Sequence, residues 1–140
     1  SVGGAENHRI GLYDRIMIKD NHRELAGLLS EEGIAESVRR ARKMYPKLEI
    51  EIEADTIDDV RKALSAGADY ILLDNMSDET MKEAVKIVAG KTKLEASGGI
   101  TFERLAKIAK IGVDFISCGA LTHSVRAIDI SMEIKKGKKK

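Results

Sequence analysis

The chain of 140 residues is long enough for one domain with a hydrophobic core and too short for two ordinary ones. Hydrophobic residues make up 43% of it and charged residues 34%, which is typical of a soluble globular protein and excludes a disordered one. No run of about 18 apolar residues and no basic-then-apolar leader is present, so a membrane protein is not expected. The single cysteine, Cys118, cannot form an intrachain disulfide, which favours a cytoplasmic location.

The charge is nearly balanced, with 24 basic and 23 acidic residues and a net charge of +1. Five of the lysines lie within residues 135–140, and the rest of the chain carries a net charge of −4. A mildly acidic body does not indicate a nucleic-acid-binding surface. We expect residues 1–134 to form the folded unit and residues 135–140 to form a basic, solvated tail.

The first half of the sequence predicts two strands, with a helix before the second of them. An apolar run at 15–19 indicates a strand, and apolar residues at helical spacing indicate a helix over 34–45. Residues 48–52 alternate apolar and acidic side chains, which is typical of a strand. Thr56 is a suitable N-cap for the next helix, and Gly67 is suited to end it.

The second half repeats this alternation. The sequence predicts strands at 70–73, 93–96 and 115–117. Ser77 and Thr101 are the expected N-caps of the helices between them, because serine and threonine hydroxyls accept hydrogen bonds from backbone N–H groups in the first turn of a helix.

The repeat is compact and regular. A polar residue or a glycine stands at the end of each of four predicted strands. These residues are Glu53, Asp74, Ser97 and Gly119, which are 21, 23 and 22 residues apart. The sequences at 67–71 and 112–116 also share the pattern Gly-x-Asp-aromatic-Ile. These features predict an α/β fold with a parallel sheet, either doubly wound or part of a TIM-like barrel. We favour the barrel, since its strand ends would converge on one mouth.

Six sequence blocks together resemble the quinolinate phosphoribosyltransferase family. They lie in the family's order and spacing at residues 4–14, 18–22, 51–53, 72–75, 95–100 and 119–124. The first block reads Gly-Ala-Glu-Asn-His-Arg-Ile-Gly-Leu-Tyr-Asp, and the fifth contains Ser-Gly-Gly. The resemblance covers residues 4 to about 132 and implies a pyridine dicarboxylate as substrate. It also implies that a preceding domain and a Thr-Arg-Lys-Thr strand of the family are missing here.

The resemblance assigns three basic residues to a pocket for quinolinate, which carries two adjacent carboxylates. Arg9 can hold a carboxylate through two parallel hydrogen bonds, and Lys19 adds a compact positive charge. His8 can donate a hydrogen bond from its ring. By chemistry alone, surface ion pairs are an equally good explanation of these residues.

The resemblance assigns Glu53 and Asp74 to Mg²⁺ and to the ribose of phosphoribosyl pyrophosphate. Magnesium prefers one or two carboxylates together with substrate phosphates and water, so two acids at strand ends suit it. Glu49, Glu51 and Glu53 share one face of their strand by parity, and spacing alone does not choose among them. Lys19, Glu53 and Asp74 are the expected catalytic residues.

Phosphate groups are expected at two glycine-containing loops. Ser97, Gly98 and Gly99 precede a helix N-terminus, where backbone N–H groups can approach an anion closely. Gly119 would form the second loop, and His123 would contact substrate there or support the loop.

The resemblance implies phosphoribosyl transfer from phosphoribosyl pyrophosphate to quinolinate with loss of CO2, giving nicotinate mononucleotide for NAD biosynthesis. Mg²⁺ is the expected cofactor, with no organic cofactor, no nucleic acid and no membrane as partner. Two alternatives stay open, a related transferase acting on another aromatic acid such as nicotinate, and an inactive phosphate-binding fragment. Exposed sheet edges predict a homo-oligomer.

Overall fold

Five parallel strands form one sheet in the computed structural model, which describes residues 2–28, 30–125 and 127–134. The strands are β1 (Arg15–Ile18), β2 (Glu49–Ala54), β3 (Tyr70–Asp74), β4 (Lys93–Ser97) and β5 (Phe115–Ile116). The helices are α1 (Asp20–Leu25), α2 (Gly33–Met44), α3 (Ile57–Ala66), α4 (Asp78–Val88), α5 (Phe102–Ala109) and α6 (Ala120–His123).

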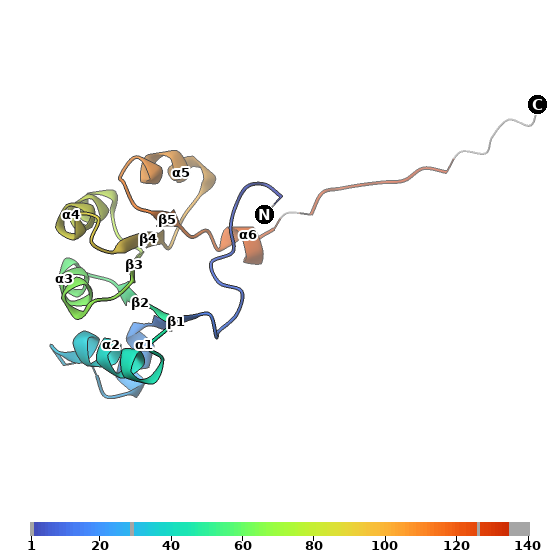
Figure 1. Cartoon of the computed structure of the whole chain (residues 1–140). Helices are drawn as coiled ribbons and strands as arrows, with labels where there is room; N and C mark the ends of the chain where they lie inside the picture. The colour runs from blue at the N-terminus through green and yellow to red at the C-terminus, as the bar shows by residue number, and fades with distance from the viewer. Residues whose placement is uncertain (1, 29, 126, 135–140) are drawn as a thin grey trace, which may run out of the picture.

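The strand order distinguishes a barrel from a doubly wound sheet. Neighbouring strands follow the chain order β1-β2-β3-β4-β5, and every pairing is parallel. A doubly wound sheet would reverse its order and place helices on both faces. Here the strands form a curved row with α2, α3, α4 and α5 outside it, whereas the N-terminal segment and α6 lie on the other side (Figure 1). The predicted α/β fold with barrel-type βα repeats is confirmed.

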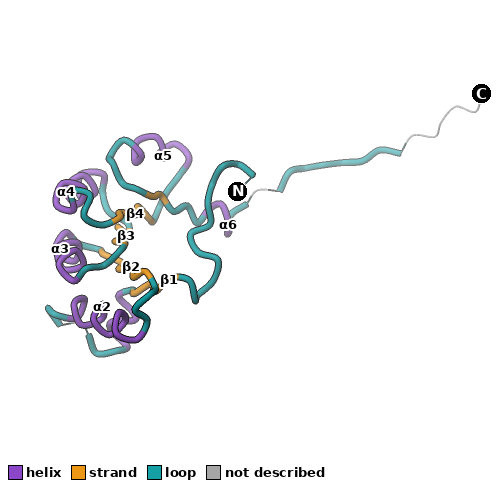
Figure 2. The backbone as a smooth tube through the Cα atoms, in the orientation of Figure 1, coloured by secondary structure: helices purple, strands orange, loops and turns teal. Residues whose placement is uncertain are grey.

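Three helices begin directly after the predicted N-caps, but only Thr56 and Ser77 accept capping hydrogen bonds, and the Thr101 hydroxyl before α5 accepts none. The Thr56 hydroxyl accepts a hydrogen bond from the Asp59 N–H at 3.1 Å, and the Ser77 hydroxyl accepts one from the Thr80 N–H at 3.1 Å. Gly67 ends α3 with a left-handed backbone, φ +76°. The short α1 and α6 were not predicted, because neither has enough residues to show a helical period (Figure 2).

The two faces of the sheet have opposite character. Side chains that point toward the helices form the hydrophobic core, and in the three central strands these are Ile50, Ile52, Ala54, Ile71, Leu73, Leu94 and Ala96. The alternate residues of the same strands include Glu51, Glu53 and Glu95, all buried. Since strand side chains alternate between faces, the apolar face builds the fold and the acidic face lines the barrel interior.

The repeated Gly-x-Asp-aromatic-Ile pattern joins adjacent strands. The Asp69 N–H donates to the Ile50 carbonyl at 2.9 Å, and an Asp69 carboxylate oxygen accepts from the Ile50 N–H at 2.8 Å. Asp114 makes the same two contacts with Leu94, both at 2.9 Å. The repeated pattern therefore has a structural role. Its aspartate forms hydrogen bonds with backbone groups at the start of the preceding strand in the sheet.

The end of the chain is less structured than its centre. Residues 127–134 contain no helix or strand. The predicted basic tail at 135–140 lies outside the described residues, and the division into a folded unit and a tail stays a prediction. Among the described residues, none of the helices has the length and apolarity needed to span a bilayer.

Candidate active site

The predicted site residues gather at the carboxyl ends of the strands. One comes from the end of each strand or the residues directly after it, in the order Lys19, Glu53, Asp74, Ser97 and Gly119. Asp74 and Ser97 are paired neighbours in the β3–β4 register. Residues spread over a hundred positions of the sequence thus lie at the same end of the sheet, where the carboxyl ends of its strands meet.

Lys19 and Glu53 form an ion pair at this edge. The Lys19 ammonium lies 3.3 Å from a Glu53 carboxylate oxygen, and the Glu53 side chain is 11% exposed while that of Lys19 is 46% exposed. The Lys19 backbone N–H donates to the His22 ring at 3.2 Å, which fixes the turn between β1 and α1. Each member of the pair serves as the counter-charge of the other.

A basic cavity opens beside this pair. It has a volume of about 400 Å³ and its lining includes Arg9, Arg15 and Lys19. Arg9 and Lys19 therefore share one cavity, as expected, and Arg15 is a third cation that the sequence did not indicate. Leu12, Ile16 and Met17 complete an apolar wall suited to a flat ring.

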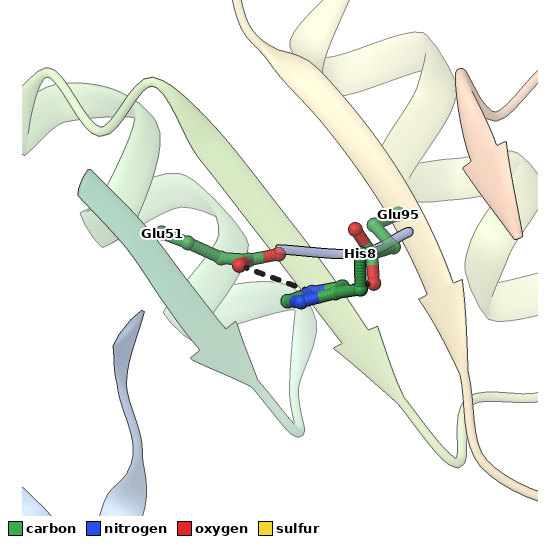
Figure 3. A group of neighbouring side chains, drawn as sticks. All are labelled: His8, Glu51 and Glu95. Atoms are coloured by element: carbon green, nitrogen blue, oxygen red, sulfur yellow. Dashed lines mark ion pairs between the residues drawn. The ribbon is translucent and has the colours of Figure 1, made fainter. Parts of the chain in front are cut away.

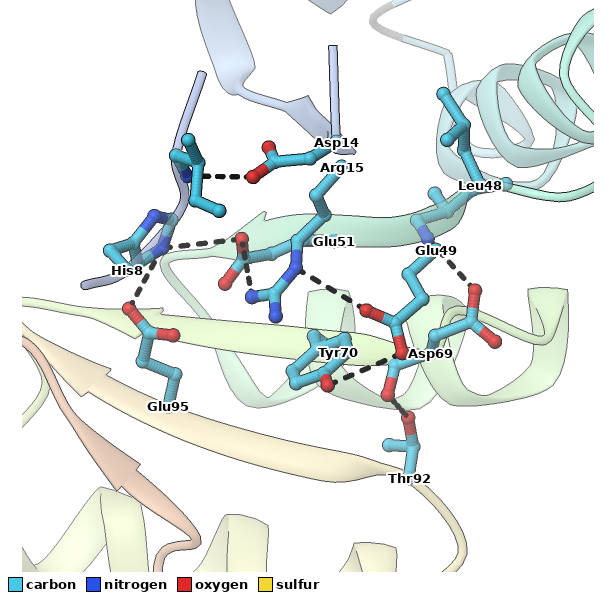
Figure 4. Close-up of polar contacts among 12 residues, drawn as sticks. His8, Asp14, Arg15, Leu48, Glu49, Glu51, Asp69, Tyr70, Thr92 and Glu95 are labelled. Atoms are coloured by element: carbon cyan, nitrogen blue, oxygen red, sulfur yellow. Dashed lines mark hydrogen bonds and ion pairs between the residues drawn. The ribbon is translucent and has the colours of Figure 1, made fainter. Parts of the chain in front are cut away.

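His8 lies next to Glu51 and Glu95 and does not line the cavity. Its Nε2 is 3.4 Å from a Glu51 oxygen and 3.2 Å from a Glu95 oxygen (Figure 3). The Arg15 guanidinium lies 3.6 Å from the same Glu51 oxygen and stacks on the Tyr70 ring at 3.8 Å (Figure 4). Parity had placed Glu51 on the inner face, but no signal in the sequence indicated that Glu95 would meet it.

Burial raises the pKa of the Glu51 carboxyl, and the nearby Glu95 carboxylate raises it further. The charges of His8 and Arg15 oppose this shift without cancelling it. A raised pKa in the folded chain means that folding favours the protonated form. The contribution of Glu51 to stability is thus fully present below its unfolded pKa, near 4.5, and is lost as the pH rises through the higher folded value.

Glu51→Gln is therefore expected to stabilise the chain at neutral pH. A chelator is added so that no metal ion compensates the charge of Glu51 in the parent chain. Near pH 4 the variant and the parent should be equally stable. The gain in unfolding free energy should grow as the pH rises, up to about 1.4 kcal/mol for each unit by which folding raises the pKa of Glu51. Urea unfolding at pH 4.5, 6 and 7.5 measures it. Glu49→Gln, on the same strand face but with a side chain 54% exposed, should show no such trend. A gain that is constant with pH would contradict the linkage.

Asp74 is held by a turn that packs against the Ser-Gly-Gly loop. The Asn75 side-chain amide donates to Asp74 at 2.8 Å, and the Asn75 N–H donates to the Ser97 carbonyl at 3.0 Å. Gly98 has φ +85°, and a Cβ there would lie 2.9 Å from the Asn75 nitrogen. Only glycine fits so close to the Asp74 turn.

The acidic part of the mouth suits a divalent cation. Burial raises the pKa of Asp55, and the carboxylates of Asp20, Asp74 and Asp59 raise it further. Asp55 directly follows β2, so the region near Glu53 and Asp74 is rich in negative charge. This oxygen-only donor set fits Mg²⁺, and Glu53 and Asp74 would hold it.

The two predicted phosphate loops lie next to each other. The Cys118 thiol donates to the Ile100 carbonyl at 3.6 Å, and Arg104 supports the first loop by donating to the Gly99 carbonyl at 3.1 Å. The His123 ring covers Gly119, where an added Cβ would lie 2.8 Å from Nε2. His123 also shares a hydrogen bond of 2.7 Å with Ser124, so in this state it supports its loop.

Comparison with known proteins identifies the family of this arrangement. A family model described as "Quinolinate phosphoribosyl transferase, C-terminal domain" matches residues 1–133. A probable nicotinate-nucleotide pyrophosphorylase (carboxylating) of Bacillus subtilis is 45% identical over 134 residues, which cover 95% of this chain and 45% of that protein. The chain thus spans about half the length of the curated relatives that it matches.

Solved structures agree with this match. The nicotinate-nucleotide pyrophosphorylase of Francisella tularensis superimposes with a TM-score of 0.81 at 44% identity, over 92% of this chain and 44% of that one. Thiamine phosphate pyrophosphorylase from Pyrococcus furiosus superimposes with a TM-score of 0.59 at 20% identity, over 74% of this chain and 48% of that one. The second likeness supports the fold alone.

Proposed function

We propose that this chain, which belongs to the quinolinate phosphoribosyltransferase family, carries the catalytic mouth for phosphoribosyl transfer to quinolinate with decarboxylation. One observation carries the proposal: a cavity with Arg9, Arg15 and Lys19 in its lining opens beside Glu53, and the neighbouring strand β3 ends at Asp74. The basic cavity fits a dianionic acceptor such as quinolinate. The two acids fit the ribose, which becomes positively charged during transfer, and its metal ion.

Quinolinate would bind in the basic cavity. Arg9 would hold one carboxylate through two parallel hydrogen bonds, and Lys19 would contribute charge to the other. Lys19 is now paired with Glu53 at 3.3 Å, so a bound carboxylate would compete with Glu53 for the ammonium. Binding of the acceptor would in this way release Glu53 toward the ribose.

Phosphoribosyl pyrophosphate would lie across the ends of β2 to β5. Its 5-phosphate suits the backbone N–H groups of Ser97, Gly98 and Gly99 at the start of α5, with Gly119 on the adjacent loop. Glu53 and Asp74 would bind the ribose hydroxyls and Mg²⁺. The metal, when bound, would neutralise charge on the departing pyrophosphate.

The reaction needs no protein nucleophile. The bond from the anomeric carbon to pyrophosphate breaks, and the electron pair leaves with the pyrophosphate. Glu53 and Asp74 stabilise the positive charge on the ribose while the ring nitrogen of quinolinate forms the new bond. The pyridinium then accepts the electron pair of the adjacent carbon–carboxylate bond, CO2 leaves, and the ring carbon takes a proton from water. Positioning and charge complementarity supply the catalysis.

Self-association forms part of this proposal. The large apolar side chains of Ile10, Leu12 and Phe102 are each more than 80% exposed, and β1 and β5 are the edges of the described sheet. Exposed apolar groups and sheet edges favour burial against another chain. Sedimentation of the chain should therefore show a dimer or higher oligomer.

The test is an assay of the 140-residue chain with quinolinate, phosphoribosyl pyrophosphate and Mg²⁺. Equal amounts of CO2, pyrophosphate and nicotinate mononucleotide are expected, and nicotinate in place of quinolinate should give no product. Calorimetric binding of both substrates is measured on the same sample, with circular dichroism as the folding control. Binding without turnover would support the site and show that half of the enzyme's length is insufficient. A folded chain that binds neither substrate would contradict the proposal.

A further inference from the structure

The inner face of the sheet holds a second group of possible metal ligands, separate from Glu53 and Asp74. His8, Glu51 and Glu95 each offer one ligand atom, and these three atoms all lie within 4.8 Å of one another. They come from the N-terminal segment, β2 and β4, and their side chains point toward a common centre (Figure 3). This group, the His8–Glu51–Glu95 cluster, has no part in the reaction proposed above.

Glu51 lacks the partners that a buried carboxylate needs. Its side chain is 0% exposed, and neither of its oxygens accepts a hydrogen bond from any described residue. The nearest nitrogen groups are the His8 ring at 3.4 Å and the Arg15 guanidinium at 3.6 Å, both beyond good hydrogen-bond length. A carboxylate removed from water is strongly destabilised unless a cation or hydrogen-bond donors compensate it. The buried position of Glu51 therefore favours a positively charged ligand beside it.

The spacing of the ligand atoms fits an ion placed between them. Two atoms that are each about 2.0–2.1 Å from a tetrahedral metal lie about 3.3 Å apart. The His8 Nε2 lies 3.4 Å from the Glu51 oxygen and 3.2 Å from the Glu95 oxygen. Both separations match this tetrahedral edge, and the Glu51 and Glu95 ligand atoms lie within 4.8 Å of each other.

The surroundings hold the ligands in place. The Ser117 hydroxyl donates a short hydrogen bond to the same Glu95 oxygen that faces His8. Metal sites commonly use such outer hydrogen bonds to orient their carboxylates. Glu51 is fixed by its position in the centre of β2, opposite Met17 in β1 and Tyr70 in β3.

We propose that His8, Glu51 and Glu95 bind one Zn²⁺ ion, with water as the fourth ligand. An imidazole nitrogen with two carboxylates is a donor set that zinc accepts, whereas magnesium prefers oxygen ligands alone. The site is distinct from the Mg²⁺ site of the proposed reaction. The binding of zinc does not depend on the proposed function.

The proposal is tested by titrating the chelator-treated full chain with Zn²⁺ alone, in competition with a chromophoric chelator. One ion per chain is expected. Glu51→Gln and Glu95→Gln should each weaken binding at least tenfold, and Ser117→Ala about tenfold. Glu49→Gln removes the same charge two residues away on the same strand face and should leave the affinity unchanged.

A second measurement guards against variants that fail to fold. Saturating Zn²⁺ should raise the urea midpoint of the parent chain and of Glu49→Gln, but not that of Glu51→Gln, whose folding is checked by circular dichroism. Absence of zinc binding to the parent would overturn the proposal. So would unchanged affinity in Glu51→Gln and Glu95→Gln, or loss of the ion in Glu53→Gln alone. None of these outcomes depends on turnover, so failure here is distinguishable from failure of the proposed enzyme activity.

Discussion

Asp74→Asn is expected to weaken Mg²⁺-dependent binding of phosphoribosyl pyrophosphate at least tenfold and to lower any turnover about 10²–10³-fold. The substitution keeps the size of the side chain and removes its charge. Asp74 is the last residue of β3, where it can meet the metal and the ribose, and an amide is a poorer ligand for Mg²⁺ than a carboxylate. Calorimetry with and without Mg²⁺ measures the binding, and pyrophosphate release measures the turnover.

The matched control is Asp58→Asn. Asp58 lies in the first turn of α3, with a side chain 66% exposed and paired with Lys62 at 2.7 Å. It loses the same charge from a side chain that pairs with Lys62 on its own helix, and it should bind as the parent does. Equal binding by Asp74→Asn and the parent would remove Asp74 from the site, whatever the activity of the chain.

Gly98→Ala is expected to damage both the fold and the phosphate loop. Gly98 has φ +85°, which costs an alanine about 1–3 kcal/mol in strain. The new Cβ would also press on the Asn75 side chain and lie 2.9 Å from the Asn75 nitrogen, so the turn that holds Asp74 must move. We expect a lower urea midpoint and at least a tenfold loss of phosphoribosyl pyrophosphate affinity.

Gly90→Ala is the control that introduces the backbone strain of Gly98→Ala without its close contact to Asn75. Gly90 has a similar backbone angle, φ +74°, but a Cβ there would meet nothing within 4 Å. It should therefore show the strain alone and keep full affinity for the ligand. If both variants bind equally well, close packing of the Ser-Gly-Gly loop on Asn75 does not shape the site.

The sequence predicted the order of the elements better than the partners of the interior side chains. Period-two alternation and hydroxyl caps are local signals, so the strands and the starts of α3 and α4 could be read from them. The same alternation placed Glu49, Glu51 and Glu53 on one face, and the structure gives them very different exposure. Glu51 is the one that side chains from distant parts of the chain surround, namely His8, Arg15 and Glu95 from the N-terminal segment, β1 and β4.

The cluster at His8 illustrates the same limit. His8 was assigned to the quinolinate pocket by resemblance alone, and the structure places it against Glu51 and Glu95. Strand alternation fixes the face of each residue, but it does not say which residues of different strands meet. The strand order does not say it either, since β3 separates Glu51 from Glu95 and His8 lies on no strand. The roles of the individual site residues stay proposals.

The opposite character of the two sheet faces makes β2 intolerant of changes in length. Its even-numbered residues Ile50, Ile52 and Ala54 are completely buried against the helices, while its odd-numbered glutamates face the interior. Deleting one residue within the strand would exchange the two sets. Acids would enter the apolar layer and isoleucines the acidic one, so both the fold and the chemistry would be lost together. Substitutions on the inner face alone leave the apolar layer intact, which gives this scaffold room to change its reaction while it keeps its fold.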